Sequence, residues 1–228
     1  VEELLKHADT AMYQAKAAGR GVARFFVPAM QEALEARLLW ESELRRGIAE
    51  GQLRLFYQVQ IGPGQRVRGV EALVRWQHPE RGLVPPGEFI ALAEDTGLIL
   101  PLGNWVLEEA CRQLAVWAHS PATAHLHIAV NVSARQFHQP GFAESVHGLI
   151  QRHGIHPSRL KLELTESLLL DNVNESIATM QALRTLGIAF SMDDFGTGYS
   201  SLTYLKRLPI DQLKIDQSFV RDLTTDRD

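Results

Sequence analysis

The sequence predicts an α/β fold, a modified TIM-type β/α barrel in which the first strand pair is antiparallel. Strand-like and helix-like segments alternate about every 30 residues after position 118, which is typical of parallel strand pairing. Each apolar strand run also carries, or ends in, a polar residue. These residues are Glu71, Asn131, Glu163, Asp193 and Lys214. Since the carboxyl ends of barrel strands open onto one rim, we expect these side chains to converge there.

The first part of the chain is predicted to be mostly helical. Apolar residues recur at helical spacing from Glu2 to Ala18, and Gly19 ends this helix. A short strand is expected at Val22–Phe26. Residues 27–40 read as a connector that becomes helical, followed by a second helix from Ser42 to near Gly51.

Two segments of alternating hydrophobicity then predict a β-hairpin. Leu53–Gln60 and Arg66–Trp76 are separated by five residues, which is too short for a parallel crossover. Alternation along the second segment places Glu71, Leu73 and Arg75 on one face of the strand.

The remainder is predicted to be a helical region followed by strand and helix units. Pro86–Ala118 is helical, with an apolar stripe of Leu107, Ala110, Cys111, Leu114 and Ala118. Strands are expected at Leu126–Val132, Leu160–Leu164, Ile188–Met192 and Gln212–Ile215, and helices at Gly141–His153, Asn174–Leu186 and Ser201–Leu208.

Composition excludes several classes of protein. With 23 Lys and Arg against 27 Asp and Glu in 228 residues, the net charge of −4 offers no general attraction for polymeric nucleic acid or an anionic membrane. Leu98–Ala118 is apolar but contains charged residues, so we expect no membrane insertion. The single Cys111 and the absence of zinc-like spacing favour the cytoplasm. Because the chain opens as helix without an initiator methionine, we expect it to be a fragment of a longer protein.

The converging polar residues predict a metal site. Several carboxylates on one rim would repel one another unless they were protonated, paired with cations or bound to metal. All the candidate ligands are oxygen donors, which suits Mg²⁺ or Mn²⁺, with Ca²⁺ as a competitor. They are Glu71, Asn131, Glu163, Asp193 and Asp194. The adjacent aspartates could flank two ions for in-line attack on a phosphodiester, with Lys214 and Arg75 neutralising charge or orienting water.

Each residue also has an ordinary structural interpretation. Glu71 and Glu163 could form structural ion pairs, and the Asp193-Asp194 pair could cap a helix. Lys214 could be solvated or paired, and Arg75 could stack on Trp76. The glycine-rich run 195–201 could be a movable lid or a static turn. His125 and His127 lack the rest of a ligand set and are expected to have surface or packing roles.

The motifs together resemble the EAL-domain family of cyclic di-GMP phosphodiesterases. The run Glu71–Trp76, EALVRW, is similar to the signature that names the family. Further matches follow in order: Pro86–Ile90, Ala93–Ile99, Asn131–Ser133, Glu163–Ser167, Asp193–Gly198 and Leu213–Asp216.

This resemblance implies a Mg²⁺- or Mn²⁺-dependent enzyme, inhibited by Ca²⁺, that hydrolyses cyclic di-GMP to linear pGpG. It implies metal ligands at Glu71, Asn131, Glu163 and Asp193, with Asp194 serving a second ion. It implies that Lys214 orients the attacking water and that Glu166 anchors the glycine-rich loop. The implied substrate contacts are Gln58, Leu73, Arg75 and Asp216. A homodimer is also expected from the resemblance.

The resemblance also suggests a domain organisation. Residues 1–28 look like the C-terminal remnant of a GGDEF-type diguanylate cyclase domain, residues 29–40 a connector helix, and residues 41–228 the EAL-type domain. The longer protein would then carry upstream GGDEF and sensor domains. Six strands are predicted from Leu53 onward, whereas a closed barrel needs about eight, so we expect the last two units to be missing.

Two other functions stay open. A catalytically inactive cyclic di-GMP receptor would bind the same ligand and signal through a partner. A magnesium-dependent barrel acting through an enolate is suggested by analogy of fold alone.

Overall fold

A computed structural model describes residues 2–17, 21–196 and 205–215. The chain forms two compact units, Val1–Gly51 and Gln52–Asp228. The first contains α1 (Glu2–Ala17) and α2 (Pro28–Ala49). The expected strand at Val22–Phe26 is wrong, because residues 22–27 form no regular structure and the Phe26 ring stacks on His7 at a centroid distance of 3.8 Å. Helix α2 is continuous rather than divided into a connector and a second helix, and it begins at Pro28, a residue that suits the first helical turn.

The second unit begins with the predicted antiparallel hairpin. Strands β1 (Leu53–Gly62) and β2 (Arg66–His78) are joined by the 3₁₀ turn η1 (Pro63–Gln65). Gln58 lies opposite Glu71 in this pair. A short strand that the sequence analysis missed, β3 (Gly82–Val84), pairs with the end of β2.

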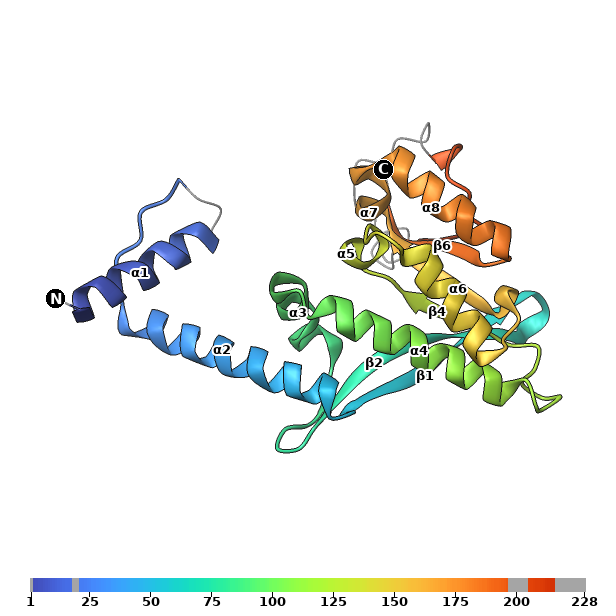
Figure 1. The fold of residues 1–228 in the computed structure, drawn as a ribbon, viewed down its shortest axis with the longest axis horizontal. Coiled ribbons are helices and arrows are strands. Elements are labelled where there is room, and N and C mark those ends of the chain that lie inside the picture. Colours follow the sequence, from blue (N-terminus) through green and yellow to red (C-terminus); the bar gives the residue numbers. More distant parts are fainter. Residues whose placement is uncertain (1, 18–20, 197–204, 216–228) are drawn as a thin grey trace, which may run out of the picture. The chain divides into compact units, whose positions relative to one another are not determined.

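The remaining strands are parallel, as predicted. They are β4 (His127–Asn131), β5 (Leu160–Thr165), β6 (Ala189–Phe195) and β7 (Gln212–Ile215). In the described part of the chain these strands form one sheet of seven strands in the order β1-β2-β4-β5-β6-β7, with β3 paired to β2. Figure 1 labels four of them, β1, β2, β4 and β6. Over the residues that the structure describes, this sheet has the mixed strand directions of the predicted barrel and is not closed.

Helices connect the parallel strands. The region after β3 contains η2 (Pro86–Glu88), α3 (Ile90–Thr96) and α4 (Ile99–Trp117), and then come α5 (Ala134–Phe137), α6 (Phe142–His153), η3 (Pro157–Arg159), α7 (Glu166–Asp171) and α8 (Val173–Leu186). The short α5 and α7 were not predicted. Ala118 does not belong to the buried stripe of α4, because the helix ends before it and it is exposed. Of the predicted helix Ser201–Leu208, residues 201–204 lie outside the described residues, and residues 206–208 form a turn and a bend.

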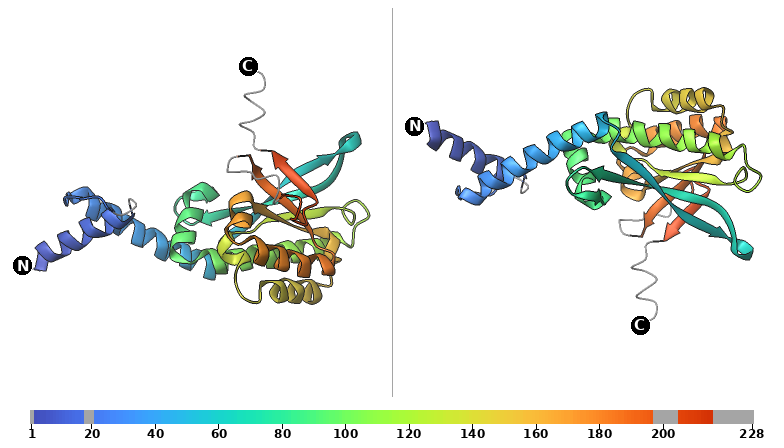
Figure 2. Two further views of the ribbon diagram at one scale, coloured as in Figure 1. Left: turned by 90° about the horizontal axis from the view of Figure 1, so that it is seen from above. Right: turned by 90° about the horizontal axis from the view of Figure 1, so that it is seen from below.

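The two faces of the sheet differ in chemistry. Residues that share one face by register are apolar and almost fully buried: Val70, Ala72, Ile128, Val130, Leu162, Leu164, Phe190 and Met192. Helices α4, α6 and α8 lie beside one another along the sheet (Figure 2), and burial of this face against them removes apolar area from water. The opposite face carries the polar residues. Strand alternation therefore separates the core from the site.

Among the helices of the described segments, none is both long enough and apolar enough to cross a membrane.

Candidate metal centre and active site

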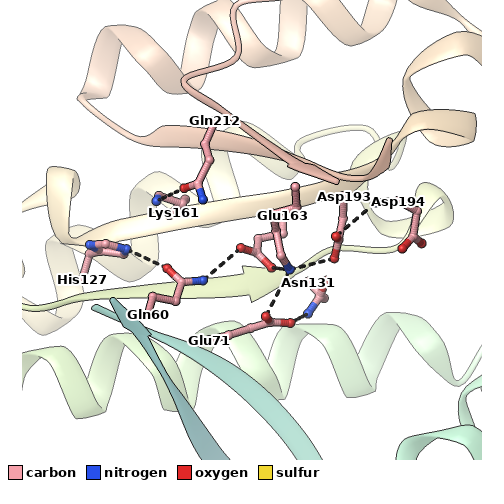
Figure 3. A network of polar contacts seen from close by, with 10 residues as sticks. Gln60, Glu71, His127, Asn131, Lys161, Glu163, Asp193, Asp194 and Gln212 are labelled. Atoms are coloured by element: carbon pink, nitrogen blue, oxygen red, sulfur yellow. Dashed lines mark hydrogen bonds and ion pairs between the residues drawn. The ribbon is translucent and has the colours of Figure 1, made fainter. Parts of the chain in front are cut away.

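Three carboxylates meet on the polar face of the sheet. Glu71 comes from the middle of β2, Glu163 from β5 and Asp193 from β6. One oxygen of each lies within 4.8 Å of the others (Figure 3). Parallel register brings them together, because Asn131 is opposite Glu163 and Thr165 is opposite Asp193, so successive strands deliver side chains to the same rim.

Lys214 on β7 lies at the centre of these carboxylates. Its Nζ donates hydrogen bonds to Glu163 Oε2 at 2.7 Å, to Asp193 Oδ2 at 2.8 Å and to Glu71 Oε2 at 3.1 Å. Burial alone would lower the pKa of Lys214, but the hydrogen bonds to these three carboxylates outweigh it and raise the pKa. The ammonium therefore stays charged at physiological pH.

Glu163 is the most deeply buried of the three carboxylates, at 1% exposure. Burial raises its pKa, the hydrogen bond from Lys214 lowers it, and the neighbouring charges of Glu71 and Asp193 raise it again, with a net rise. The cluster thus places three carboxyl groups around one ammonium. An all-oxygen donor set in which acidic groups outnumber the basic one fits a hard divalent cation.

Two further predicted ligands lie at the edge of this group. Asn131 Nδ2 donates to Glu71 Oε1 at 2.8 Å, which fixes the amide beside the carboxylates. The Asp194 N–H donates to Asp193 Oδ1 at 3.0 Å, and Asp194 has a left-handed backbone with φ of 54°. That turn sets the exposed Asp194 carboxylate to one side of the cluster (Figure 3).

Three of the predicted substrate contacts lie on the hairpin strands β1 and β2. Gln58 and Leu73 share the polar face by register, and Gln58 is exposed. Arg75 Nη1 donates to the Val74 carbonyl at 2.8 Å, and its guanidinium lies 5.9 Å from the centroid of the Phe56 ring. Arg75 therefore lies over the ring of Phe56, whereas the sequence suggested stacking on Trp76. Asp216 lies outside the described residues.

Glu166 contacts the segment that follows the aspartates. It is buried at the start of α7, and its Oε2 accepts a hydrogen bond from the Gly196 N–H at 3.2 Å. Gly196 has a φ of 102°, a conformation that favours glycine. The rest of the expected lid, residues 197–201, lies outside the described residues.

Sequence analysis missed two residues that belong to the same polar network. Gln60 Nε2 lies 3.4 Å from Glu163 Oε1, and Gln60 Oε1 lies 3.0 Å from His127 Nε2 (Figure 3). His127 was expected to have a surface or packing role. His127 lies four residues before Asn131 on the same strand, so the two side chains share one face. This spacing could have placed His127 on the polar face from the sequence.

Comparison with known proteins identifies the family of this chain. A family model described as the EAL domain matches residues 41–228. The chain belongs to the EAL domain family. This EAL domain is also similar to a solved structure titled as the MucR phosphodiesterase in complex with c-di-GMP, with a TM-score of 0.78, 46% identity, and coverage of 82% of this chain and 76% of that chain.

Two curated relatives of this EAL domain are also informative. MucR of Pseudomonas aeruginosa, named as a bifunctional diguanylate cyclase/cyclic di-GMP phosphodiesterase, is 46% identical over 99% of this chain. PdeR of Escherichia coli, named as a cyclic di-GMP phosphodiesterase, is 44% identical over 96% of this chain. The chain spans 33% of the length of each of these relatives.

Proposed function

We propose that this EAL domain hydrolyses cyclic di-GMP to linear pGpG with the help of bound Mg²⁺ or Mn²⁺. The observation that carries the proposal is the group of three carboxylates around Lys214, built from four strands of the sheet. The relatives MucR and PdeR are both named as cyclic di-GMP phosphodiesterases, which supports cyclic di-GMP as the substrate and phosphodiester hydrolysis as the reaction.

Four residues would hold the cation, namely Glu71, Asn131, Glu163 and Asp193, with Asp194 placed for a second ion. A bound divalent cation supplies Lewis acidity toward a phosphate oxygen and makes a nearby water more acidic. Calcium would compete for the same oxygens and inhibit, because it prefers a larger and more flexible coordination shell.

The chain's own groups would act on the substrate and the water. Lys214 carries a positive charge beside the carboxylates, suited to orienting the attacking water and offsetting charge that develops on the phosphate. Gln58, Leu73 and Arg75, on the strand pair beside the cluster, would contact the nucleotide, as would Asp216. Glu166 would hold the glycine-rich loop through Gly196.

Three further proposals concern the cellular location, the oligomeric state and the neighbouring domains of the chain. We propose a cytoplasmic location, a homodimer, and upstream GGDEF and sensor domains in a longer chain. The rival function is a catalytically inactive receptor for the same nucleotide. Retention of every predicted carboxylate favours the enzyme, because a receptor would not require them.

The test is turnover of cyclic di-GMP with Mg²⁺, Mn²⁺, Ca²⁺ or a chelator, with products separated by chromatography. We expect pGpG with Mg²⁺ or Mn²⁺ and none with Ca²⁺ or chelator. Glu163→Gln should lower the rate by at least about 100-fold, since loss even of a residue that supports a metal ligand costs about 10- to 100-fold. Glu144→Gln, at an exposed position on α6, is the matched control and should leave the rate unchanged. Binding of the nucleotide without product under every condition would instead support the receptor.

A further inference from the structure

A row of three residues crosses the sheet on the polar face, one position below the carboxylates. Gln60 on β1 is the register partner of Gly69 on β2, and Gly69 is in turn the register partner of His127 on β4. The three residues therefore lie side by side across β1, β2 and β4. None of them takes part in the function proposed above.

Gly69 makes room for the His127 ring. A Cβ at Gly69 would lie 2.5 Å from Cδ2, Cε1 and Nε2 of His127, which is closer than side-chain atoms can approach. Gly69 is not among the residues with positive φ, so steric space rather than backbone conformation is what glycine provides here. Because β2 presents no side chain at this point, the imidazole leans across it and reaches Gln60.

Gln60 connects that ring to the buried carboxylate. Its Oε1 lies 3.0 Å from His127 Nε2, and its Nε2 donates to Glu163 Oε1 at 3.4 Å. Glu163 Oε2 accepts from Lys214 at 2.7 Å. Each oxygen of Glu163 thus meets a different donor, and together the two donors define the plane of the carboxylate.

The direction of the amide depends on the ring. Gln60 can donate to Glu163 only if its oxygen faces His127, and that oxygen then requires a hydrogen on Nε2 of the imidazole. Burial and the charge of Lys161 lower the pKa of His127 to about 4, although a hydrogen bond to the Arg68 backbone acts in the opposite direction, so the ring is neutral at physiological pH and carries one ring hydrogen. Of the two neutral tautomers, the one with this hydrogen on Nε2 donates to Gln60 Oε1 and holds the amide in the orientation that serves Glu163.

We propose that Gln60 is a positioning residue for Glu163, and that His127, admitted by Gly69, sets the orientation of the Gln60 amide. The inference rests on the proposed function, because it treats Glu163 as a metal ligand. Hydrogen bonds of this kind hold a ligand in its binding geometry, and their loss weakens metal affinity about 10- to 100-fold.

The first experiment measures the Kd for Mn²⁺ by electron paramagnetic resonance, without nucleotide, and then kcat and KM for cyclic di-GMP. Gln60→Met keeps the length of the side chain and removes both hydrogen bonds. We expect its Kd for Mn²⁺ to rise about 10-fold or more, with KM nearly unchanged. Gln77→Met, at an exposed position on β2, is the matched control and should bind Mn²⁺ as the wild type does.

Two further variants test the supporting residues without touching Gln60. His127→Phe keeps a ring but cannot donate, and Gly69→Ala displaces the ring without removing any polar group. Both should weaken Mn²⁺ binding, less than Gln60→Met does. The double variant Gln60→Met/His127→Phe should match Gln60→Met alone, because His127 acts only through the amide. Thermal melting checks that each variant is folded. If Gln60→Met does not fold, the Mn²⁺ affinities of His127→Phe and Gly69→Ala test the proposal.

The outcomes separate the two proposals. If the wild-type chain binds no Mn²⁺, the proposed function fails and this inference fails with it. If the wild type binds Mn²⁺ and folded Gln60→Met, His127→Phe and Gly69→Ala bind it equally well, the inference alone is overturned. Additive losses in the double variant would remove His127 from the proposal.

Discussion

Lys214 balances the charges of the polar centre. Three carboxylates within a few ångströms repel one another, and the single ammonium among them offsets part of that repulsion through hydrogen bonds of 2.7–3.1 Å. The same contacts hold the three carboxylate groups facing one another around the ammonium.

Cys111 is a free cysteine inside the packed core. It is fully buried in α4, and burial raises the pKa of its thiol from 9.0 to about 12, with a further rise from Glu108. Since the thiolate is the reactive form, we expect iodoacetamide to leave Cys111 unmodified in the folded protein near neutral pH and to label it rapidly in concentrated guanidinium chloride. Mass spectrometry of the intact chain measures the labelling.

The sign of the pH effect at Cys111 follows from the same shift. A raised pKa means that the fold favours the neutral thiol. The associated stability is complete below pH 9 and is lost as the pH rises toward 12. Rapid labelling of the native protein near neutral pH would show that α4 opens without global unfolding.

Helix α4 shows how one element connects the sheet to the helical layer. Leu107 is 2% exposed on its buried face, whereas Val116 is 52% exposed on the opposite face. Both are apolar residues of the same helix, and they differ most in burial.

We expect Leu107→Ala to lower the free energy of unfolding by about 2–5 kcal/mol, because it leaves a cavity in a packed core. Val116→Ala should change it by no more than about 0.5 kcal/mol, as is usual for exposed positions. Urea unfolding followed by circular dichroism measures both. Equal effects of the two substitutions would mean that α4 does not pack on the sheet through its apolar stripe.

The candidate metal centre depends on the folded sheet, because the residues proposed as its ligands lie on β2, β4, β5 and β6. Glu71 and Asp193 are far apart in the sequence, so an unfolded chain does not present the same set of oxygens. A cation that binds only the folded state stabilises it, by about 2.7 kcal/mol at a concentration of 100 times Kd.

We therefore expect Mn²⁺ to raise the melting temperature of the wild-type chain. Glu163→Gln should abolish most of this shift, and Glu144→Gln should retain it. Scanning calorimetry with and without Mn²⁺ measures the difference. An equal shift in both variants would place the bound ion elsewhere on the molecule.

Much of the architecture could be predicted from local patterns. Alternation of period two indicated the hairpin and the apolar strands, and regular β/α spacing indicated parallel pairing, because these periods reflect which side chains face the core. The short elements β3, α5 and α7 were missed, since so few residues carry no periodic signal. The strand expected at residues 22–26 is wrong, because no strand of the described segments pairs with these residues.

The sequence by itself determined that acidic and amide side chains would stand at the ends of neighbouring strands, and its motifs indicated the EAL family. Only the tertiary structure decided that Lys214 lies among three carboxylates, that Glu163 is the most deeply buried of them, and that Gln60 and His127 belong to the same network. The physical reason is that hydrogen bonds between residues 21 to 143 positions apart depend on strand register and sheet curvature. Local periodicity specifies which face a side chain occupies, whereas register specifies which neighbour it meets there.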